Sequence, residues 1–340
     1  MLIKSIYLYN FRTFIDKRFT FTEQNNLIIG LNGKGKSNLI EAINFLSSAR
    51  SFKTNINKEI INFNQKEASL IAEVVNEKKV SKINIVFKED GSKKISINNS
   101  ILNKSSDLLK EFTAILVSPN DITIIDGTPS VRRRYLDTIL SKTLPGYLDI
   151  VKEQKRIIDI KRKVLKGNTI NEDLLNIYHE QLKKVNTKIV SYRTKILQEI
   201  QETANKYFKQ YYYKVGFIEL KYVDTFLLED IVKEKNYREC LYGSHRDDFE
   251  IYLNEKSAKK YSSTGEKRLI SLLMKISEKN LFNDKLKIKP VLLLDDAFLG
   301  LDDERQTIFY ELIESDHQKI LTSTEDKYQN KVINPSILRL

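Results

Sequence analysis

The stretch Gly30-Leu31-Asn32-Gly33-Lys34-Gly35-Lys36-Ser37 decides the fold class of this 340-residue chain. It matches the pattern G-x-x-x-x-G-K-S, which is typical of a loop that binds phosphate groups. Residues 26–29 precede it as a short apolar strand, and residues 38–48 follow with apolar side chains at helical spacing. A chance Gly- and Lys-rich turn is the alternative, and the flanking strand and helix argue against it. We therefore predict an α/β fold built around a phosphate loop.

The residue types of this loop suit a nucleoside triphosphate with its metal ion. Glycines let successive backbone N–H groups converge on phosphate oxygens, and the helix N-terminus adds a positive dipole. Lys36 is expected to neutralise the β- and γ-phosphates, and the Ser37 hydroxyl to coordinate Mg²⁺. The expected cofactors are therefore ATP and Mg²⁺. The residues expected to bind the nucleotide in this segment are Gly30, Leu31, Asn32, Gly33, Lys34, Gly35, Lys36, Ser37 and Asn38.

A second acidic motif lies near the other end of the chain. Four apolar residues, 291–294, are typical of a strand buried on both faces, and Asp295 and Asp296 follow it directly. Such a strand delivers its carboxylates to the sheet edge beside the phosphate loop. We expect Asp295 to hold Mg²⁺, and Asp296 to polarise the attacking water as a catalytic residue beside Lys36. A core strand ending in a solvated acidic turn is the alternative.

Two further segments flank this strand. Tyr261-Ser262-Ser263-Thr264-Gly265-Glu266-Lys267-Arg268 resembles the signature of ABC-type ATPases, in which a Ser hydroxyl and a Gly N–H contact a γ-phosphate. Ser263 and Gly265 are the corresponding residues. A plain helix N-cap, with Glu266 completing a capping box, explains the same residues equally well. Leu299-Gly300-Leu301-Asp302 resembles the D-loop of these ATPases, which makes Asp302 a site residue.

The order of these motifs is that of the ABC superfamily and predicts a homodimer. In that architecture, the signature of one protomer completes the nucleotide site of another. This chain has one phosphate loop and one signature, so completing a site requires a second copy. We expect an ATP-dependent homodimer in which Ser263 and Gly265 act in trans.

Five more motifs make the chain resemble the RecF family over nearly its whole length. They are Tyr9-Asn10-Phe11-Arg12-Thr13-Phe14, Ser51-Phe52-Lys53, Ser118-Pro119-Asn120-Asp121, Pro129-Ser130-Val131-Arg132-Arg133-Arg134-Tyr135-Leu136-Asp137 and Gly243-Ser244-His245-Arg246-Asp247-Asp248. The resemblance implies that Arg12 lies near the nucleotide and that Asp121 takes the role of the ABC Q-loop. The chain departs from the family pattern at Ser244, where proline is usual, and at Glu266, where an amide is usual. A carboxylate near a γ-phosphate weakens engagement through like-charge repulsion.

The resemblance also implies a function. It is that of a DNA-binding ATPase of recombinational repair and replication-gap processing, which dimerises with ATP on duplex or gapped DNA without regard to sequence. Hydrolysis is expected to be slow, stimulated by DNA and used for release. The implied partners are RecR, and indirectly RecO and the RecA recombinase, whose loading the protein assists.

The charge balance agrees with a polyanionic partner. Lys and Arg number 57 against 45 Asp and Glu, which gives a formal net charge of +12. Basic residues crowd two segments, and the DNA-binding candidates are Arg132, Arg133, Arg134, Lys152, Lys155, Arg156, Lys161 and Arg162. A solvated helix face is the alternative. One cysteine and three histidines argue against a disulfide framework and against a His- or Cys-based metal cluster.

Periodicity along the chain predicts an ABC-type, SMC-like ATPase head with an inserted, mainly helical subdomain. Residues 144–166 and 171–209 have helical spacing, and the second stretch carries a short heptad-like seam that pairs it with the first. The expected pieces are 1–143 as the N-terminal half of the head, 144–214 as the helical insertion and 215–340 as the C-terminal half. No run reaches membrane-spanning length, and a signal peptide is not expected, so the sequence predicts a cytoplasmic protein without a membrane partner.

Two rival functions remain open at this stage. A nuclease-linked head of the OLD type requires a C-terminal metal-binding domain, and the roughly forty residues after Asp296 are too few for one. A DNA-binding scaffold that does not hydrolyse ATP is the other rival, because the signature is altered.

Overall fold

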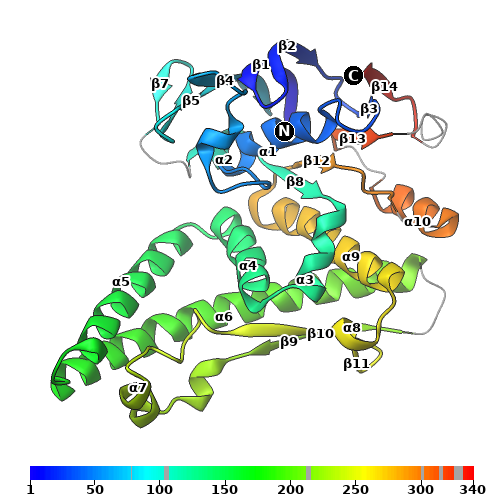
Figure 1. Ribbon diagram of the computed structural model, residues 1–340. Helices are drawn as coiled ribbons and strands as arrows, with labels where there is room; N and C mark the ends of the chain where they lie inside the picture. Colours follow the sequence, from blue (N-terminus) through cyan, green and yellow to red (C-terminus); the bar gives the residue numbers. More distant parts are fainter. Residues whose placement is uncertain (78, 103–106, 212–215, 300–301, 314–316, 325–331) are drawn as a thin grey trace. The chain divides into compact units, whose positions relative to one another are not determined.

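The structure is a computed structural model that describes residues 1–340 except 78, 103–106, 212–215, 300–301, 314–316 and 325–331 (Figure 1). Contacts divide the chain into two compact units. The first unit contains residues 1–120 and 282–340, and the second contains residues 121–281. Residues from both ends of the chain therefore build the first unit, as the predicted head requires.

A parallel sheet forms the half of the first unit that carries the phosphate loop. Its strand order is β14-β3-β13-β12-β8, and neighbouring strands are parallel. The strands are β3 (Asn25–Ile29), β8 (Ala114–Val117), β12 (Val291–Leu294), β13 (Lys319–Ser323) and β14 (Ser336–Arg339). All residues of β3, β12 and β13 are buried, and β12 is the uninterrupted apolar run that is typical of a strand covered on both faces. The strand β14 was not expected from the sequence pattern.

An antiparallel sheet forms the other half of this unit, in the order β2-β1-β4-β5-β6-β7. Its strands are β1 (Leu2–Phe11), β2 (Phe14–Thr20), β4 (Glu67–Asn76), β5 (Lys79–Lys88), β6 (Lys93–Ile97) and β7 (Ser100–Ile101). Burial alternates along β4 and β5, since one sheet face lies on the core and the other faces solvent. A turn at Asp90-Gly91 joins β5 to β6, with Gly91 at φ +80°.

Helix α1 (Lys36–Ser48) connects the two sheets through one hydrophobic core. That core combines apolar side chains of α1, such as Ile43 and Phe45, with Ile6 and Phe87 of the antiparallel sheet and Leu293 of the parallel sheet. The remaining elements of the unit are η1 (Asn57–Ile60), α2 (Leu108–Glu111), η3 (Pro119–Ile122, the last two residues of which belong to the second unit) and α10 (Asp303–Ile313). The loop before α1 is thereby fixed to a rigid base.

A pair of long helices dominates the second unit. Helices α5 (Tyr147–Lys166) and α6 (Glu172–Tyr211) pack together through a cluster that includes Ile157, Leu182 and Ile189. These helices and the predicted seam agree with the sequence analysis. The other elements are α3 (Thr123–Asp126), α4 (Pro129–Thr143), β9 (Ile218–Val223), η4 (Thr225–Leu228), α7 (Ile231–Tyr237), β10 (Asp248–Leu253), β11 (Lys256–Ser257), α8 (Ala258–Tyr261) and α9 (Thr264–Leu286).

The compact units differ in extent from the predicted pieces. Helix α4 packs on α6 and β10, and β9 packs on α6, so the second unit is larger than the predicted insertion of residues 144–214. Contacts assign α9 to the second unit up to Leu281. Among the described residues, no helix combines the length and the apolar character needed to cross a membrane.

Candidate nucleotide-binding site

The phosphate loop joins β3 to α1 and owes its shape to glycine. Gly33 and Gly35 have φ values of +83° and +101°, which favour residues without a Cβ. A Cβ on Gly35 would also lie 2.8 Å from Cζ of Phe14 and 2.9 Å from Oγ1 of Thr13. The turn after β1 therefore lies directly against the loop. Residues 31–34 are exposed, and the Lys34 N–H donates to the Leu31 carbonyl oxygen at 3.3 Å within the loop.

Lys36 bends back over the loop that precedes it. Its ammonium group donates hydrogen bonds to the carbonyl oxygens of Gly30, at 2.7 Å, and of Leu31, at 3.2 Å. The residue is buried, so the charge is held inside the loop. An ammonium group in this position suits the neutralisation of bound phosphate.

Ser37 and Asp295 meet at the carboxyl edge of the parallel sheet, as the two motifs predict. The Ser37 hydroxyl donates to Oδ1 of Asp295 at 3.0 Å, although the residues are 258 positions apart. Adjacent ligands of an octahedral Mg²⁺ ion, each about 2.1 Å from the metal, lie about 3 Å apart. Hydroxyl and carboxylate oxygens are hard donors, so this pair fits Mg²⁺ with phosphate and water as further ligands. Within the described residues, no cluster of three or more His, Cys, Asp or Glu side chains offers another metal site.

Asp296 follows in a left-handed backbone conformation, with φ at +46°. That conformation is unfavourable by roughly 1 kcal/mol for most residues, and a hydrogen bond of similar worth stabilises it here. The Asp296 N–H donates to Oγ1 of Thr322 at 2.8 Å. Partial burial and the neighbouring Asp295 raise the pKa of the Asp296 carboxyl, while Lys36 and Thr322 act in the opposite direction. The raised pKa suits a carboxylate that accepts a proton.

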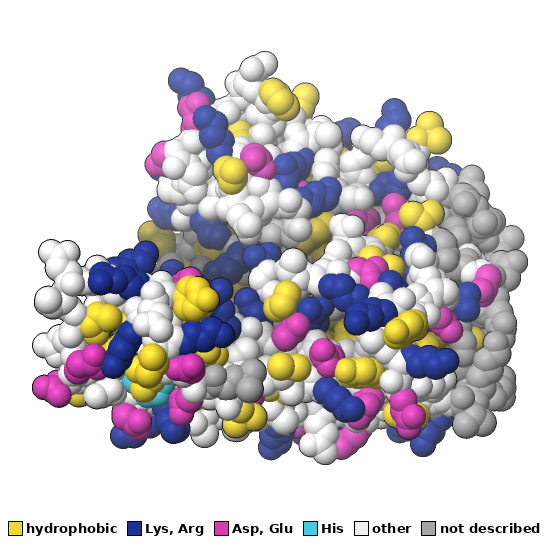
Figure 2. Space-filling model, turned by 60° about the horizontal axis from the view of Figure 1, so that its bottom comes forward, with side chains coloured by type: hydrophobic (Ala, Val, Ile, Leu, Met, Phe, Trp, Pro, Cys, Tyr) yellow, Lys and Arg dark blue, Asp and Glu magenta, His cyan; other side chains and the backbone are white. Residues whose placement is uncertain are grey.

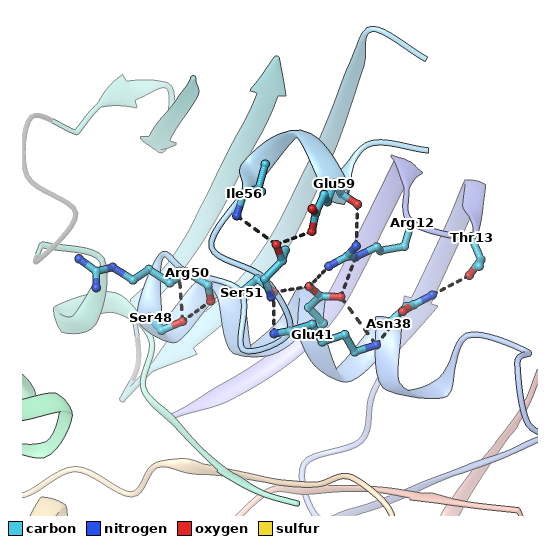
Figure 3. Close-up of polar contacts among 11 residues, drawn as sticks. Arg12, Thr13, Asn38, Glu41, Ser48, Arg50, Ser51, Ile56 and Glu59 are labelled. Carbon is cyan, nitrogen blue, oxygen red and sulfur yellow. Dashed lines mark hydrogen bonds and ion pairs between the residues drawn. The ribbon is translucent and has the colours of Figure 1, made fainter. Parts of the chain in front are cut away.

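A polar network joins the segment after α1 to that helix and to Arg12 (Figure 3). The Arg12 guanidinium donates twice to the buried Glu41 carboxylate, at 2.9 and 2.6 Å, and once to the Glu59 carbonyl oxygen, at 2.6 Å. The Ser51 hydroxyl donates to the same carboxylate at 2.5 Å. Asn38 joins through its side chain, which donates to Thr13 Oγ1 at 3.0 Å. Arg12, expected near the nucleotide, is thus fixed by an ion pair beside the phosphate-loop helix.

Lys53 is a further cation beside the loop, and it is not among the expected site residues. Its ammonium group donates to Oδ1 of Asn38 at 2.8 Å and lies 3.8 Å from Glu41. Burial lowers the pKa of Lys53, whereas the charges of Glu41 and Asp295 raise it. The motif Ser51-Phe52-Lys53 is the sequence signal that marks Lys53.

The signature segment at the start of α9 forms the capping box that was the alternative interpretation. The Ser263 N–H and hydroxyl both donate to Oε2 of Glu266, at 2.8 and 3.0 Å, and the Glu266 N–H donates to the Ser263 hydroxyl at 3.3 Å. Gly265 lies within this first turn. The contact of Ser263 and Gly265 with a nucleotide in trans stays a prediction.

Two further expected site residues are Asp302, just before α10, and Asp121, within η3. Asp302 caps α10: its carboxylate accepts the Arg305 N–H at 2.8 Å and forms an ion pair with the Arg305 side chain. Gly300 and Leu301 of the same motif lie outside the described residues. Asp121 lies in η3 of the second unit. Burial lowers the pKa of Lys275, but Glu278 and Asp121 raise it, and the net direction is upward. The Q-loop role of Asp121 also stays a prediction.

Comparison with known proteins defines the family. The family model of the RecF/RecN/SMC N terminal domain matches residues 2–337. The DNA replication and repair protein RecF of Clostridium perfringens is 32% identical over 319 residues, covering 90% of this chain and 88% of that protein. RecF of an Exiguobacterium species is 31% identical and covers 95% and 92%. The chain belongs to the RecF family.

Solved structures support the same assignment. A structure of the recombination mediator protein RecF with ATPrS in the RecFOR pathway matches with a TM-score of 0.88 and 29% identity, covering all of this chain and 96% of that one. A RecF–ATP structure gives 0.86 and 30%, covering 95% and 92%. An Smc head, at 0.58 and 19%, shows the fold alone. The predicted α/β, ABC-type, SMC-like head with a helical insertion is confirmed, and RecF membership makes the chain a DNA replication and repair protein of an ATPase family.

The most discriminating RecF motif, at residues 243–248, forms a structural network in the second unit. The buried Asp247 carboxylate accepts the Tyr222 hydroxyl at 2.8 Å and the Thr225 hydroxyl at 2.6 Å. Asp248 accepts two hydrogen bonds from Arg132, at 2.6 and 2.8 Å. Arg132 is 6% exposed and also donates to backbone carbonyls, so its expected role in DNA binding is corrected to a structural one.

Serine in place of the usual RecF proline is compensated locally. The Ser244 N–H and hydroxyl both donate to Oδ1 of Asn186, at 3.2 and 2.9 Å. Gln154 donates to the same oxygen at 2.8 Å and also bonds the Ser244 hydroxyl. Proline lacks an N–H and a hydroxyl, so it could not make these hydrogen bonds.

The basic residues of α5 separate into a buried set and an exposed set. Lys161 is fully buried, 2.5 Å from Oε2 of Glu234 and 3.1 Å from Nδ1 of His179. An ammonium group held in this way is not available to DNA phosphates, so the DNA-binding prediction for Lys161 is wrong. Arg133, half-buried, donates to the Asp247 carbonyl oxygen at 2.7 Å, and Arg162 pairs with Asp159 at 3.7 Å. The exposed members on α4 and α5 are Arg134, Lys152, Lys155, Arg156, Lys163 and Lys166.

The protonation of His245 gives this RecF-family protein an expected pH dependence. Burial lowers the pKa of His245 to about 4. Since an unfolded histidine has a pKa near 6.5, the stability from the neutral ring is complete above about pH 6.5 and falls as pH drops toward 4. Between pH 7.5 and pH 5, wild type should lose about 2 kcal/mol more unfolding free energy than His245→Gln, measured by urea denaturation. Equal losses in the two proteins would contradict this.

Proposed function

We propose that the protein is a DNA-binding ATPase of recombinational repair and replication-gap processing, which binds ATP with Mg²⁺ and dimerises around the nucleotide. One observation carries the proposal: Ser37 Oγ lies 3.0 Å from Asp295 Oδ1, directly after a glycine loop with a buried lysine. That arrangement combines phosphate binding and metal binding at one sheet edge.

Each residue of this edge has a defined task in ATP hydrolysis. The loop N–H groups and Lys36 bind and orient the β- and γ-phosphates. Ser37 and Asp295 would hold Mg²⁺, which neutralises charge on the phosphates when bound. Asp296 orients the attacking water and accepts its proton. We expect hydrolysis to be slow and stimulated by DNA, and to return the protein to the conformation that releases DNA.

A second copy of the chain completes each site. Ser263 and Gly265 of one protomer would contact the γ-phosphate bound by the other, with Asp302 and Asp121 as D-loop and Q-loop residues. The capping box supports a defined helix start at Ser263. For the hydroxyl to reach a phosphate, its bond to Glu266 must exchange.

Light scattering tests the dimer directly. The Asp296→Asn protein is expected to be a monomer without nucleotide and a dimer with ATP and Mg²⁺, because bound ATP is retained and adds contacts between the copies. Ser263→Arg in the same background should remain a monomer, since a bulky cation replaces the signature hydroxyl. If Asp296→Asn remained a monomer under both conditions, the proposed ATP-dependent dimer would be contradicted.

DNA binding is assigned to the exposed basic stripe of α5. Figure 2 shows Lys and Arg side chains, mixed with other types, on the part of the second unit that contains α5 to α7. Lys152, Lys155, Arg156, Lys163 and Lys166 lie on the exposed side of α5. Such a stripe contacts phosphates without reading sequence.

Charge reversal tests this surface. Lys155→Glu with Arg156→Glu should weaken binding to duplex DNA at least about tenfold and lower the salt dependence by roughly one counterion per lost contact. Lys188→Glu with Lys195→Glu, both exposed on α6, changes the net charge equally and serves as the control. Fluorescence anisotropy across salt concentrations measures both. Equal losses in the two variants would contradict a local site.

The proposed partners follow from the family. The solved relatives are described as recombination mediators of the RecFOR pathway, which supports RecR as direct partner, RecO as indirect partner and RecA as the recombinase whose loading is assisted. Co-sedimentation with purified RecR tests the direct contact.

One observation favours a second candidate, a DNA-binding scaffold without turnover. Glu266 places a carboxylate against the Ser263 hydroxyl, where like charges would repel a γ-phosphate. Phosphate release on gapped DNA, with and without RecR, separates the two functions: a rate no higher than that of Asp296→Asn favours the scaffold.

A further inference from the structure

A single buried hydroxyl, that of Thr322, links the two carboxylate residues of the candidate site. It donates to Oδ1 of Asp295 at 2.9 Å and accepts the N–H of Asp296 at 2.8 Å. Thr322 is 1% exposed and lies in β13, far in sequence from both partners. The hydroxyl has one proton, so its donor bond goes to the carboxylate and its lone pair takes the backbone N–H.

We propose that Thr322 is a positioning residue for metal binding and ATP hydrolysis, which rests on the proposed function. Its hydroxyl fixes the carboxylate that is expected to hold Mg²⁺ and the turn that carries the expected general base. Thr322 is itself neither a metal ligand nor a reacting group.

The strand order places Thr322 between the strand that leads into the phosphate loop and the strand that ends at Asp295. β13 lies between β3, which leads into the phosphate loop, and β12, which ends at Asp295. Thr322 is paired with Ile28 of β3 and follows Leu321, which is paired with Leu294 of β12. The middle strand therefore connects the two motifs at their common edge. A β-branched side chain in a buried strand also has few rotamers, so the hydroxyl direction is well fixed.

Ser37 cannot perform this task alone. Oδ1 of Asp295 accepts hydroxyls from both Ser37 and Thr322. Ser37 is expected to turn its oxygen toward Mg²⁺, which changes its bond to Asp295. Thr322 is not a ligand and can hold Asp295 in both states. Partners of this kind typically change metal affinity or activity 10- to 100-fold when removed.

Two substitutions at Thr322 separate the hydroxyl from the shape of the side chain. Thr322→Val removes the hydroxyl and keeps the shape, whereas Thr322→Ser keeps the hydroxyl. Thr113→Val is the matched control, because Thr113 is also 1% exposed and bonds the Leu109 carbonyl oxygen at 3.0 Å, before the start of β8. Circular dichroism checks the fold, and Thr322→Ala replaces Thr322→Val if the latter does not fold.

The first readout is the dissociation constant of a fluorescent ATP analogue in EDTA and in Mg²⁺. In EDTA, the dissociation constant of Thr322→Val should lie within about twofold of the wild-type value. The increase in affinity when Mg²⁺ is present should be about tenfold smaller in Thr322→Val than in wild type. The second readout, phosphate release, should slow by about 10- to 100-fold. Thr322→Ser and Thr113→Val should match wild type within about threefold in both.

Two outcomes would overturn the inference alone. One is a Thr322→Val protein equal to wild type in both readouts, while wild type itself binds with Mg²⁺ and hydrolyses ATP. The other is a Thr322→Ser protein as impaired as Thr322→Val, which would exclude the hydroxyl. A wild-type protein without any gain from Mg²⁺ would overturn the proposed function, and this inference with it.

Discussion

The Asp296→Asn protein is expected to bind ATP within about threefold of wild type and to release phosphate at least about 100-fold more slowly. General bases contribute roughly 10²- to 10⁴-fold, and an amide cannot accept the proton of the attacking water. Asparagine keeps the size of the side chain, tolerates the left-handed backbone at φ +46° and retains the N–H bond to Thr322. Stopped-flow phosphate detection measures the rate, and equilibrium titration measures the affinity.

Asp16→Asn is the control for this substitution. Asp16 is exposed on β2, and its replacement removes the same charge away from the sheet edge that carries Asp296. Its rate should equal that of wild type. A turnover in Asp296→Asn within tenfold of wild type would mean that another group takes the proton.

The Lys36→Ala protein is expected to lose ATP binding by at least about 100-fold and to lose ATP-dependent retention on DNA with it. The ammonium group is the buried cation of the phosphate loop, and hydrogen bonds between charged groups are worth about 1.5–3 kcal/mol each. Because nucleotide holds the dimer on DNA in the proposed cycle, both properties should disappear together. A filter-binding assay with labelled ATP and a DNA-retention assay measure them.

Lys17→Ala provides the matched control outside the phosphate loop. Lys17 is exposed on β2, so ATP binding should change by less than about threefold. Retention on DNA that survives in Lys36→Ala would contradict the link between nucleotide and DNA.

Those parts of the candidate site that lie in short continuous segments could be predicted from local sequence patterns. The phosphate loop, the acidic pair after β12 and the capping box at Ser263 each lie where a few consecutive residues dictate the backbone. Ser37 and Asp295 could be paired from the sequence because parallel strands end at a common edge. The structure adds the distance between them.

Lys161 shows that a run of basic residues can include a buried one. Lys161 lies four residues from Ile157 and from Leu165, both buried, so helical spacing alone places it on the packed face of α5. Its partner Glu234 lies 73 residues further on, in α7. Counting basic residues therefore overestimated the DNA-binding surface, and only tertiary packing identified the ion pair.

Other features had no local signal. The strand β14 is a short run near the end of the chain that becomes a strand by pairing with β3. Thr322 acquires its role only from two partners 26 and 27 residues away. The second unit includes α4 and β9 because they pack on α6, a fact that periodicity does not encode.

Equilibrium titration of the wild-type protein with labelled ATP, in Mg²⁺ and in EDTA, is the most direct test. We predict uptake of about one nucleotide per chain in Mg²⁺, with clearly weaker binding in EDTA, because Ser37 and Asp295 form a metal site beside the phosphate loop. Absence of uptake with Mg²⁺ present would contradict the assignment of this edge to ATP.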